Sequence, residues 1–186
     1  MTVLTIDKSG WLQAVDIVHS PNFDARPENT KISLVVIHGI SLPPGKFGGG
    51  YIQQFFCNQL DVGAHDCFQQ IADMGVSAHC LIERNGNVVQ FVSFLHRAWH
   101  AGVSSWQGVE ACNDFSIGIE LEGTDELAYA DAQYERLGEL IESLKYRFPD
   151  ITNDRICGHS DVAPGRKTDP GPAFDWQRLR QIMNSV

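Results

Sequence analysis

The amino-acid sequence predicts an α/β protein in which helices flank a central mixed β-sheet. Strand-like and helix-like segments interleave along the 186 residues, as is typical of a sheet covered by helices. A hairpin expected around Asn85-Gly86 argues against a purely parallel sheet. The sequence has no internal repeat, low-complexity tract or linker-like change in composition, so we expect residues 1–186 to form a single domain.

The first half of the chain predicts a buried strand, a loop and short helices. Residues 33–38 form a β-branched apolar run that indicates a strand buried on both faces, with His38 at its C-terminal edge. Residues 42–50 contain two prolines and three successive glycines, which predicts a loop. Apolar residues at helical spacing within 51–74 predict one or two short amphipathic helices.

The middle of the chain predicts a hairpin and a second central strand. Residues 79–84 and 87–94 flank Asn85-Gly86, a dipeptide that favours a type I′ turn because both central residues need positive φ. In residues 115–123 the odd-numbered apolar residues share one face of a strand. Glu120 and Glu122 share the other face, so two carboxylates lie on one side.

Two helices and an irregular loop complete the prediction. Apolar residues follow a 3.6-residue period from about 131 to 148, and Pro149 ends that helix. A last helix is expected to begin near Asp175 as its N-cap. It would bury Trp176, Leu179, Ile182 and Met183. Residues 158–172 contain three prolines and three glycines, which argues against regular structure there.

The composition excludes several classes of partner. With 14 Lys and Arg against 23 Asp and Glu, the formal charge is −9, which has the wrong sign for general attraction to nucleic acid or anionic lipid. The start of the chain lacks the pattern of a secretory signal, and no apolar stretch reaches transmembrane length, so we expect a cytoplasmic protein. No feature of the sequence indicates a protein partner.

The five cysteines form neither a disulfide framework nor a zinc knuckle. Their number is odd and no C-x-x-C pair occurs, so reduced thiols are the simplest interpretation. A cysteine nucleophile remains a minor alternative, with Cys157 near His159 or Cys80 beside His79 as candidates.

Residues 158–172 also concentrate functional side chains on a loop, although a polar surface loop is an equally good interpretation of this segment alone. A catalytic zinc takes three nitrogen or oxygen ligands and keeps a fourth position for water. His38, His159 and Asp169 would supply such a set, although they are far apart in the sequence. His96 and His100 have an i, i+4 spacing, but the Glu of H-E-x-x-H is missing, so we reject them as a zinc motif.

The chain resembles the N-acetylmuramoyl-L-alanine amidases of the peptidoglycan-recognition and phage-lysozyme superfamily, from about residue 11 to residue 176. It is most similar to their cytoplasmic branch, the 1,6-anhydro-N-acetylmuramyl-L-alanine amidases of cell-wall recycling. The segments that carry the resemblance occur in the family's order: Val36-Ile37-His38-Gly39-Ile40-Ser41, Val76-Ser77-Ala78-His79, Ala98-Trp99-His100-Ala101-Gly102, Ile117-Gly118-Ile119-Glu120 and the loop from His159 to Pro172, including Arg-Lys-Thr-Asp-Pro-Gly-Pro.

The resemblance implies the family's amidase fold, Zn²⁺ as cofactor and soluble anhydro-muropeptides as substrate. It implies zinc ligands at His38, His159 and Asp169, with Glu120 and Lys167 as the catalytic pair. At the third ligand position phage lysozyme has Cys, whereas this chain has Asp169, like the amidases of the recycling branch. Gly39 departs from close relatives, which often carry Asn there.

Glu120 would act as general base and then acid, and Lys167 would stabilise the oxyanion. Without the resemblance, Glu120 would be better interpreted as part of a solvated strand face and Lys167 as a surface charge. Trp99 and His100 are candidate substrate contacts, with packing as the alternative. Glu122 is expected to be either a structural carboxylate or one that supports the residues of the site. The main alternative to an enzyme is a muropeptide-recognition module, which the presence of all three ligands and both catalytic residues disfavours.

Overall fold

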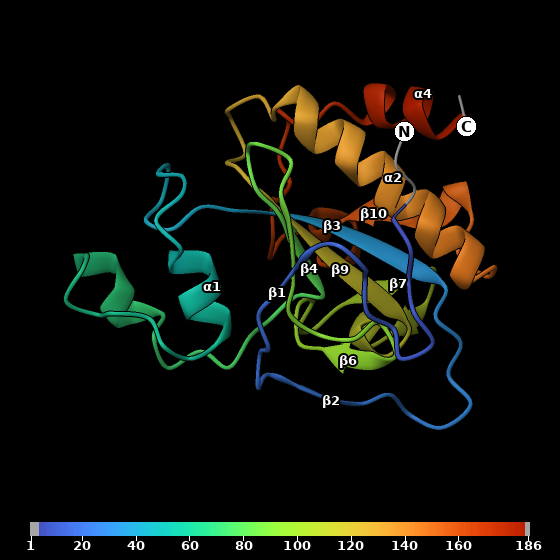
Figure 1. Cartoon of the computed structure of the whole chain (residues 1–186), viewed down its shortest axis with the longest axis horizontal. Coiled ribbons are helices and arrows are strands. Elements are labelled where there is room, and N and C mark those ends of the chain that lie inside the picture. Colours follow the sequence, from blue (N-terminus) through green and yellow to red (C-terminus); the bar gives the residue numbers. More distant parts are fainter. Residues whose placement is uncertain (1–3, 185–186) are drawn as a thin grey trace.

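The computed structural model describes residues 4–184, and a six-stranded mixed sheet lies at its centre (Figure 1). The strand order is β1-β5-β4-β9-β3-β10. Strands β4, β9, β3 and β10 run parallel, and β5 is antiparallel to β4 and parallel to β1, so the predicted mixed sheet is confirmed. The bounds are β1 Asp16–Ile17, β3 Leu34–Ile40, β4 Cys80–Ile82, β5 Val88–Gln90, β9 Ser116–Glu122 and β10 Ile156–Gly158.

Two helices cover one face of this sheet. Helix α2, Asp131–Arg147, and helix α4, Trp176–Asn184, lie together on that face (Figure 1). Gly138 in α2 allows a close approach, because a Cβ there would lie 2.4 Å from Ile182 of α4. The core under the helices includes Val35, Ile37, Ile117, Ile119, Leu121, Leu137, Leu140, Ile141, Leu144 and Leu179.

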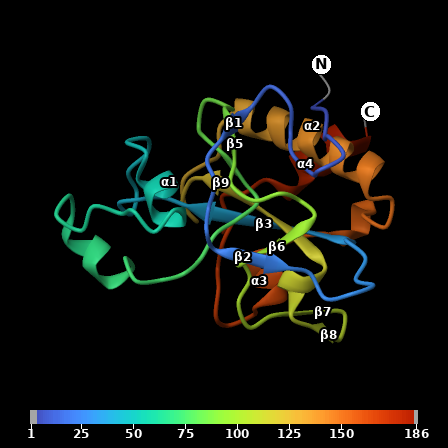
Figure 2. The same cartoon turned by 60° about the horizontal axis from the view of Figure 1, so that its bottom comes forward.

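The opposite face carries smaller elements. Helix α1, Tyr51–Phe56, and the 3₁₀ helix η1, Asp66–Gln70, belong to a segment that extends away from the sheet (Figure 1). Helix α3, His159–Val162, and the two-stranded sheets lie on the side of the main sheet away from α2 (Figure 2). These sheets pair β2, Phe23–Ala25, with β6, His96–Ala98, and β7, Ser105–Trp106, with β8, Val109–Glu110. Two further 3₁₀ helices are η2, Cys112–Asp114, and η3, Asn153–Arg155.

Most of the predicted elements are confirmed with small shifts. The strand after residue 33 continues past His38 to Ile40, and the helices of 131–148 and 176–184 begin and end close to the predicted residues. Asp175 caps α4, since its Oδ1 accepts the Arg178 N–H at 2.9 Å. The helix predicted within 51–74 is one α-helical turn and a half followed by a 3₁₀ turn, α1 and η1.

Three local predictions were wrong. The hairpin loop is not a two-residue type I′ turn: only Gly86 has positive φ, at 85°, and its N–H donates to Glu83 O at 2.8 Å, because the loop is one residue longer. The loop at 158–172 begins with a helical turn, α3, since its prolines lie beyond that turn. Phe115 precedes β9 and packs with Leu34 on the opposite face from Ile117.

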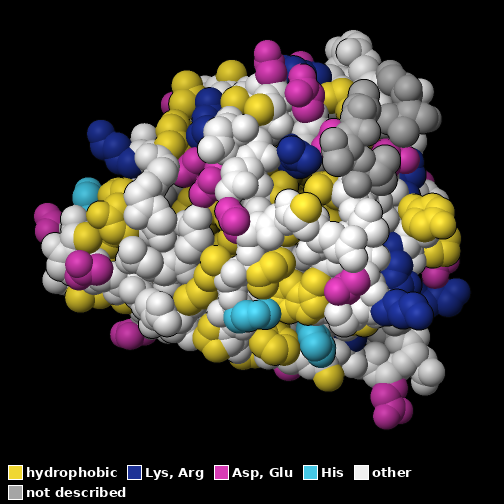
Figure 3. Space-filling view, viewed as in Figure 1, with side chains coloured by type: hydrophobic (Ala, Val, Ile, Leu, Met, Phe, Trp, Pro, Cys, Tyr) yellow, Lys and Arg dark blue, Asp and Glu magenta, His cyan; other side chains and the backbone are white. Residues whose placement is uncertain are grey.

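Acidic and basic side chains are interspersed on the face shown in Figure 3, with hydrophobic side chains between them. The exposed hydrophobic residues include Ile17, Phe23 and Leu95. Within residues 4–184 no helix combines the length and the apolar composition needed to cross a bilayer.

The packing of α2 predicts a large stability effect at its centre. Leu137 is completely buried, so Leu137→Ala should lower the free energy of unfolding by about 2–5 kcal/mol through lost burial and the cavity left behind. The control is Leu127→Ala, because Leu127 is 48% exposed and the same truncation should change stability by less than about 0.5 kcal/mol. Urea unfolding measures both, and equal effects would contradict the assigned core.

Candidate metal centre and active site

The candidate site lies near the C-terminal ends of three parallel strands, β3, β9 and β10. His38 of β3 is the direct register partner of Glu120 of β9, so their side chains emerge side by side on one face. Gly158 of β10 pairs with Ile37, and His159 follows at once as the first residue of α3. Parallel pairing therefore brings three polar residues from distant segments to one place.

Asp169 completes a compact cluster with the two histidines. The Nδ1 atoms of His38 and His159 lie 3.0 Å apart, and Asp169 Oδ2 lies 3.0 Å from His159 Nδ1. The distance from Asp169 Oδ2 to His38 Nδ1 is 3.4 Å. Two atoms bound to one tetrahedral zinc at usual bond lengths lie about 3.3 Å apart, so this donor set matches a zinc site in chemistry and in spacing.

Burial keeps His38 of the cluster in the form that binds metal. It lowers the pKa of His38 to about 4, against the opposing effect of the hydrogen bond that His38 donates to the Asp169 carboxylate. For Asp169, burial alone would raise the pKa, but the hydrogen bonds to His159 and His38 outweigh it and lower the pKa. Near neutral pH His38 is therefore a neutral imidazole beside the Asp169 carboxylate, as metal binding requires.

Glu120 points its carboxyl group toward the same cluster. Its Oε1 lies 4.0 Å from His38 Nδ1, and its Oε2 is buried without a hydrogen-bond partner among the described residues. Burial raises the pKa of Glu120 well above its usual value, the Asp169 carboxylate adds to the rise, and Lys167 opposes it. A buried, unpaired carboxyl group is costly for stability and is typical of functional sites.

Lys167 lies on the segment that follows α3, two residues before Asp169. Its side chain is exposed, while its backbone N–H donates to Ala163 O at 3.1 Å. Its positive charge opposes the rise in the pKa of Glu120 and contributes to the lowered pKa of His38. Of the two predicted catalytic residues, Glu120 thus lies 4.0 Å from a predicted ligand, and Lys167 acts on the cluster through its charge.

His100 lies behind His38, on the side of that ring away from the cluster. Its Nδ1 is 3.0 Å from His38 Nε2, and its Nε2 is 3.1 Å from Ser116 Oγ. The ring rests on Gly118, where a Cβ would lie 2.4 Å from it. Metal-binding histidines commonly engage their second nitrogen in this way, and sequence patterns alone did not reveal this arrangement.

The second nitrogen of His159 is held similarly, since Nε2 lies 3.3 Å from Ala101 O. Arg26 is half-buried nearby and donates to the carbonyl oxygens of Asn113, Asp114, Phe94 and Ser116. Burial, reinforced by the Arg26 charge, lowers the pKa of His79 to about 3. The layer under the ligands is therefore made of neutral imidazoles.

Glu122 has a structural role, as expected. Its Oε1 accepts the Gly48 N–H at 2.5 Å, and its Oε2 accepts the Arg84 N–H at 3.3 Å. It thereby fastens the glycine-rich loop to the hairpin, and it is separate from the cluster of His38, His159 and Asp169.

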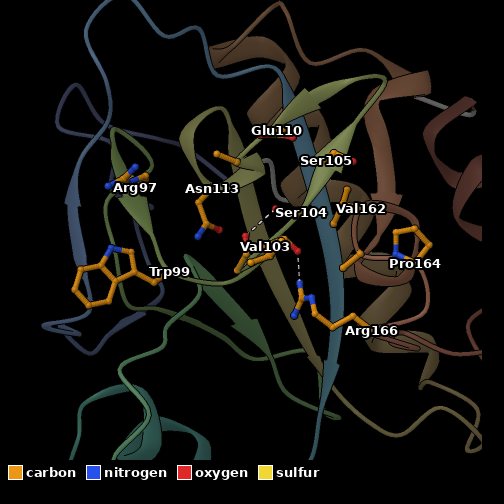
Figure 4. A pocket seen from close by; sticks show the side chains of 13 residues that line it. Arg97, Trp99, Val103, Ser104, Ser105, Glu110, Asn113, Val162, Pro164 and Arg166 are labelled. Carbon is orange, nitrogen blue, oxygen red and sulfur yellow. Dashed lines mark hydrogen bonds between the residues drawn. The ribbon is translucent and has the colours of Figure 1, made fainter.

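A cavity of about 880 Å³ is lined by residues between Arg97 and Asn113 and between Val162 and Arg166 (Figure 4). In the close-up, Arg97 and Trp99 lie on one side of it, and Pro164 and Arg166 lie on the other. Of the two predicted substrate contacts, Trp99 lines this cavity and His100 does not. His38, His159 and Asp169 do not line it either.

The cysteines show little sign of nucleophilic character. All five are free, and burial raises the pKa of Cys80 and of Cys157. The Cys157 thiol faces Val35 O at 3.7 Å, whereas the His159 ring faces the cluster. His65 Nδ1 lies 3.1 Å from Cys67 Sγ, but this contact is on the exposed η1 segment and not in the site.

Comparison with known proteins gives consistent matches. The chain is 55% identical over 177 residues to the 1,6-anhydro-N-acetylmuramyl-L-alanine amidase AmpD of Escherichia coli, covering 95% of this chain and 96% of that protein. A crystal structure of a selenomethionine AmpD derivative superposes with a TM-score of 0.93 at 55% identity, covering 96% of this chain and 99% of the other.

A more distant match has a substrate bound. The E. coli amidase AmiD, in complex with anhydro-N-acetylmuramic acid-L-Ala-D-gamma-Glu-L-Lys, gives a TM-score of 0.59 at 28% identity, covering 95% of this chain and 65% of AmiD. The family model described as N-acetylmuramoyl-L-alanine amidase matches residues 28–172, which include every residue of the cluster. This chain belongs to the N-acetylmuramoyl-L-alanine amidase family.

Proposed function

We propose that this protein is a zinc-dependent amidase of cell-wall recycling, which hydrolyses the bond between 1,6-anhydro-N-acetylmuramic acid and L-alanine in soluble muropeptides. The observation that carries the proposal is the convergence of His38, His159 and Asp169 beside Glu120. The activity in the name of the E. coli relative and the anhydromuropeptide bound to AmiD support the choice of substrate.

The proposed metal ligands are Nδ1 of His38, Nδ1 of His159 and Oδ2 of Asp169. Zinc bound to this set would supply an activated water molecule and polarise the scissile carbonyl group. The protein contributes two imidazoles and one carboxylate in fixed positions, because the second nitrogens of the histidines face His100 and Ala101 O.

The chain's own acid–base groups complete the reaction. Glu120 takes a proton from the attacking water onto its carboxylate and passes it to the departing amine of L-alanine, for which a raised pKa is suitable. The Lys167 ammonium stabilises the negative charge that develops on the carbonyl oxygen. Trp99 remains the candidate substrate contact, and His100 orients His38.

The proposed partner is the soluble anhydro-muropeptide, and the proposed place of the reaction is the cytoplasm, which cell fractionation would test. The sequence and the described surface give no basis for a nucleic-acid, membrane or protein partner. A muropeptide-binding module without activity is disfavoured, because the chain combines three metal-binding groups with a buried carboxyl group and a nearby ammonium.

The metal assignment predicts one tightly bound zinc per chain. His38→Ala and Asp169→Ala should lose zinc and activity together, because each removes one of three ligands. His96→Ala is the matched control, since His96 is exposed on β6 outside the cluster and this variant should keep both. Elemental analysis and turnover of a defined muropeptide measure the two properties. Full activity in protein shown to be metal-free would refute the assignment.

Glu120→Gln should keep zinc and fold while lowering the turnover rate by roughly 10²- to 10⁴-fold, the usual size of a general acid–base contribution. Lys167→Ala should lose rate to a similar extent through weaker oxyanion stabilisation. Glu126→Gln and Lys46→Ala make the same chemical changes at exposed positions and should leave the rate unchanged. If Glu120→Gln retained the wild-type rate, the general base would have to be another residue.

Offered equal amounts of anhydro-muropeptide and purified sacculi, the enzyme should release peptide faster from the soluble fragment. The reason is the net charge of −9, which offers no attraction to anionic wall polymers, together with the similarity to recycling amidases. Mass spectrometry of the products identifies the bond cleaved. Faster release from sacculi, or sugar fragments produced by glycosidic cleavage, would contradict the proposed substrate.

A further inference from the structure

Pro170, which follows the aspartate of the cluster, packs against the backbone beside both histidines. One neighbouring glycine, Gly39, directly follows His38, and the other, Gly158, directly precedes His159. A Cβ on Gly39 would lie 3.5 Å from Pro170 Cα, and a Cβ on Gly158 would lie 2.9 Å from Pro170 Cδ. Pro170, which is next to the ligand Asp169, thus contacts Gly39 and Gly158, which are next to the other two ligands.

The hydroxyl of Tyr129 holds Pro170 in this place. Tyr129 is 5% exposed and its hydroxyl donates to Pro170 O at 3.0 Å. Burial raises the pKa of Tyr129, so the group is a neutral donor at physiological pH. Its ring packs on Gly123 and edge-on to Phe174, which leaves the hydroxyl little freedom to move.

Gly39 makes room for that hydroxyl. A Cβ at position 39 would lie 2.3 Å from Tyr129 Oη, closer than two unbonded atoms can approach. The next nearest atoms, Tyr129 Cζ and Pro170 Cα, would be 3.6 and 3.5 Å away, which is ordinary contact. A side chain at Gly39 is therefore incompatible with the hydroxyl of Tyr129 and compatible with the rest of the packing.

The backbone on the other side of Pro170 is also held. The carbonyl oxygen of Asp169 accepts the Ser160 N–H at 3.0 Å, and the Gly171 N–H donates to Thr168 O at 3.0 Å. The Tyr129 hydroxyl adds a side-chain hydrogen bond to this turn, and Tyr129 belongs to the segment between β9 and α2. Loss of that bond would free Pro170, and with it the main chain that carries the Asp169 carboxylate.

We infer that Tyr129 is a positioning residue for the metal site: its hydroxyl holds Pro170 against Gly39 and Gly158, and so sets the distance from the Asp169 carboxylate to the two histidine nitrogens. The inference rests on the proposed zinc-dependent function. It also gives Gly39 a role, since the glycine admits the hydroxyl next to the first ligand.

The test is zinc affinity, measured by equilibrium competition with a chelator on the full chain. Tyr129→Phe removes only the hydroxyl and should weaken zinc binding by about 10- to 100-fold, the usual effect of losing a group that supports a metal ligand. Tyr134→Phe is the matched control: Tyr134 is 3% exposed, and its hydroxyl accepts the Asp175 N–H at 2.6 Å between α2 and α4. That variant should bind zinc as the wild type does.

Gly39→Ala supplies an independent test of the same contact. It should weaken zinc binding in the wild-type background, because the new methyl group displaces the Tyr129 hydroxyl. In the Tyr129→Phe background the space is open, so Gly39→Ala should add little further loss, and the two changes should be clearly non-additive.

The outcomes separate the inference from the proposed function. If the wild type bound zinc and Tyr129→Phe bound it equally well, the inference would be overturned while the proposed function stood. Equal weakening by Tyr129→Phe and Tyr134→Phe would reduce the effect to general destabilisation and would also overturn the inference. A wild-type protein that bound no zinc would overturn the proposed function and the inference together.

Discussion

The parallel pairing of β3 with β9 and β10 is the constraint on which the site depends. It places His38 opposite Glu120 in register and brings Gly158, and so His159, to the same edge of the sheet. Because side chains alternate along a strand, a slip of one residue would turn His38 or Glu120 into the apolar layer under α2. The apolar residues that alternate with them, including Ile37 and Ile119, oppose such a slip, so the core that stabilises the fold also fixes the geometry of the site.

The site combines buried charge with buried neutral imidazole in a way that favours function over stability. Glu120 lies within a central strand, yet one of its carboxyl oxygens is buried without a hydrogen-bond partner among residues 4–184, and burial raises its pKa. Burial lowers the pKa of His38 and of His100, which lies behind it, so the rings stay neutral. Such local conflicts between burial and charge are expected where a sequence serves chemistry, because elsewhere a folded chain avoids them.

Much of the fold could be predicted because local patterns report it directly. The period of helix α2, the cap at Asp175 and the alternation of β9 depend on neighbouring residues alone. Predictions that depended on the exact length of a loop, or on the exact residue where a loop begins, were less accurate. The hairpin loop has three residues before the ladder resumes, so Gly86 alone takes the left-handed conformation. Likewise, the proline-rich loop has the helical turn α3 near its start, because residues 159–162 contain neither proline nor glycine.

The sequence by itself predicted which residues form the candidate site: the family segments contain His38, His159, Asp169, Glu120 and Lys167, the groups that the proposed metal-dependent amidase chemistry needs. Only the tertiary structure decided how they meet, because the two histidines are 121 residues apart and their distance depends on strand pairing, which no local pattern encodes. The same holds for residues that act through others. His100, which was predicted to contact substrate, lies behind His38 in the space left by Gly118. The role of Gly39 depends on Tyr129, which is remote in sequence and adjacent in space. The secondary-structure preference of a residue depends on its neighbours in the sequence. The geometry of the metal-binding groups depends instead on packing between the layers of the fold, which only the tertiary structure determines.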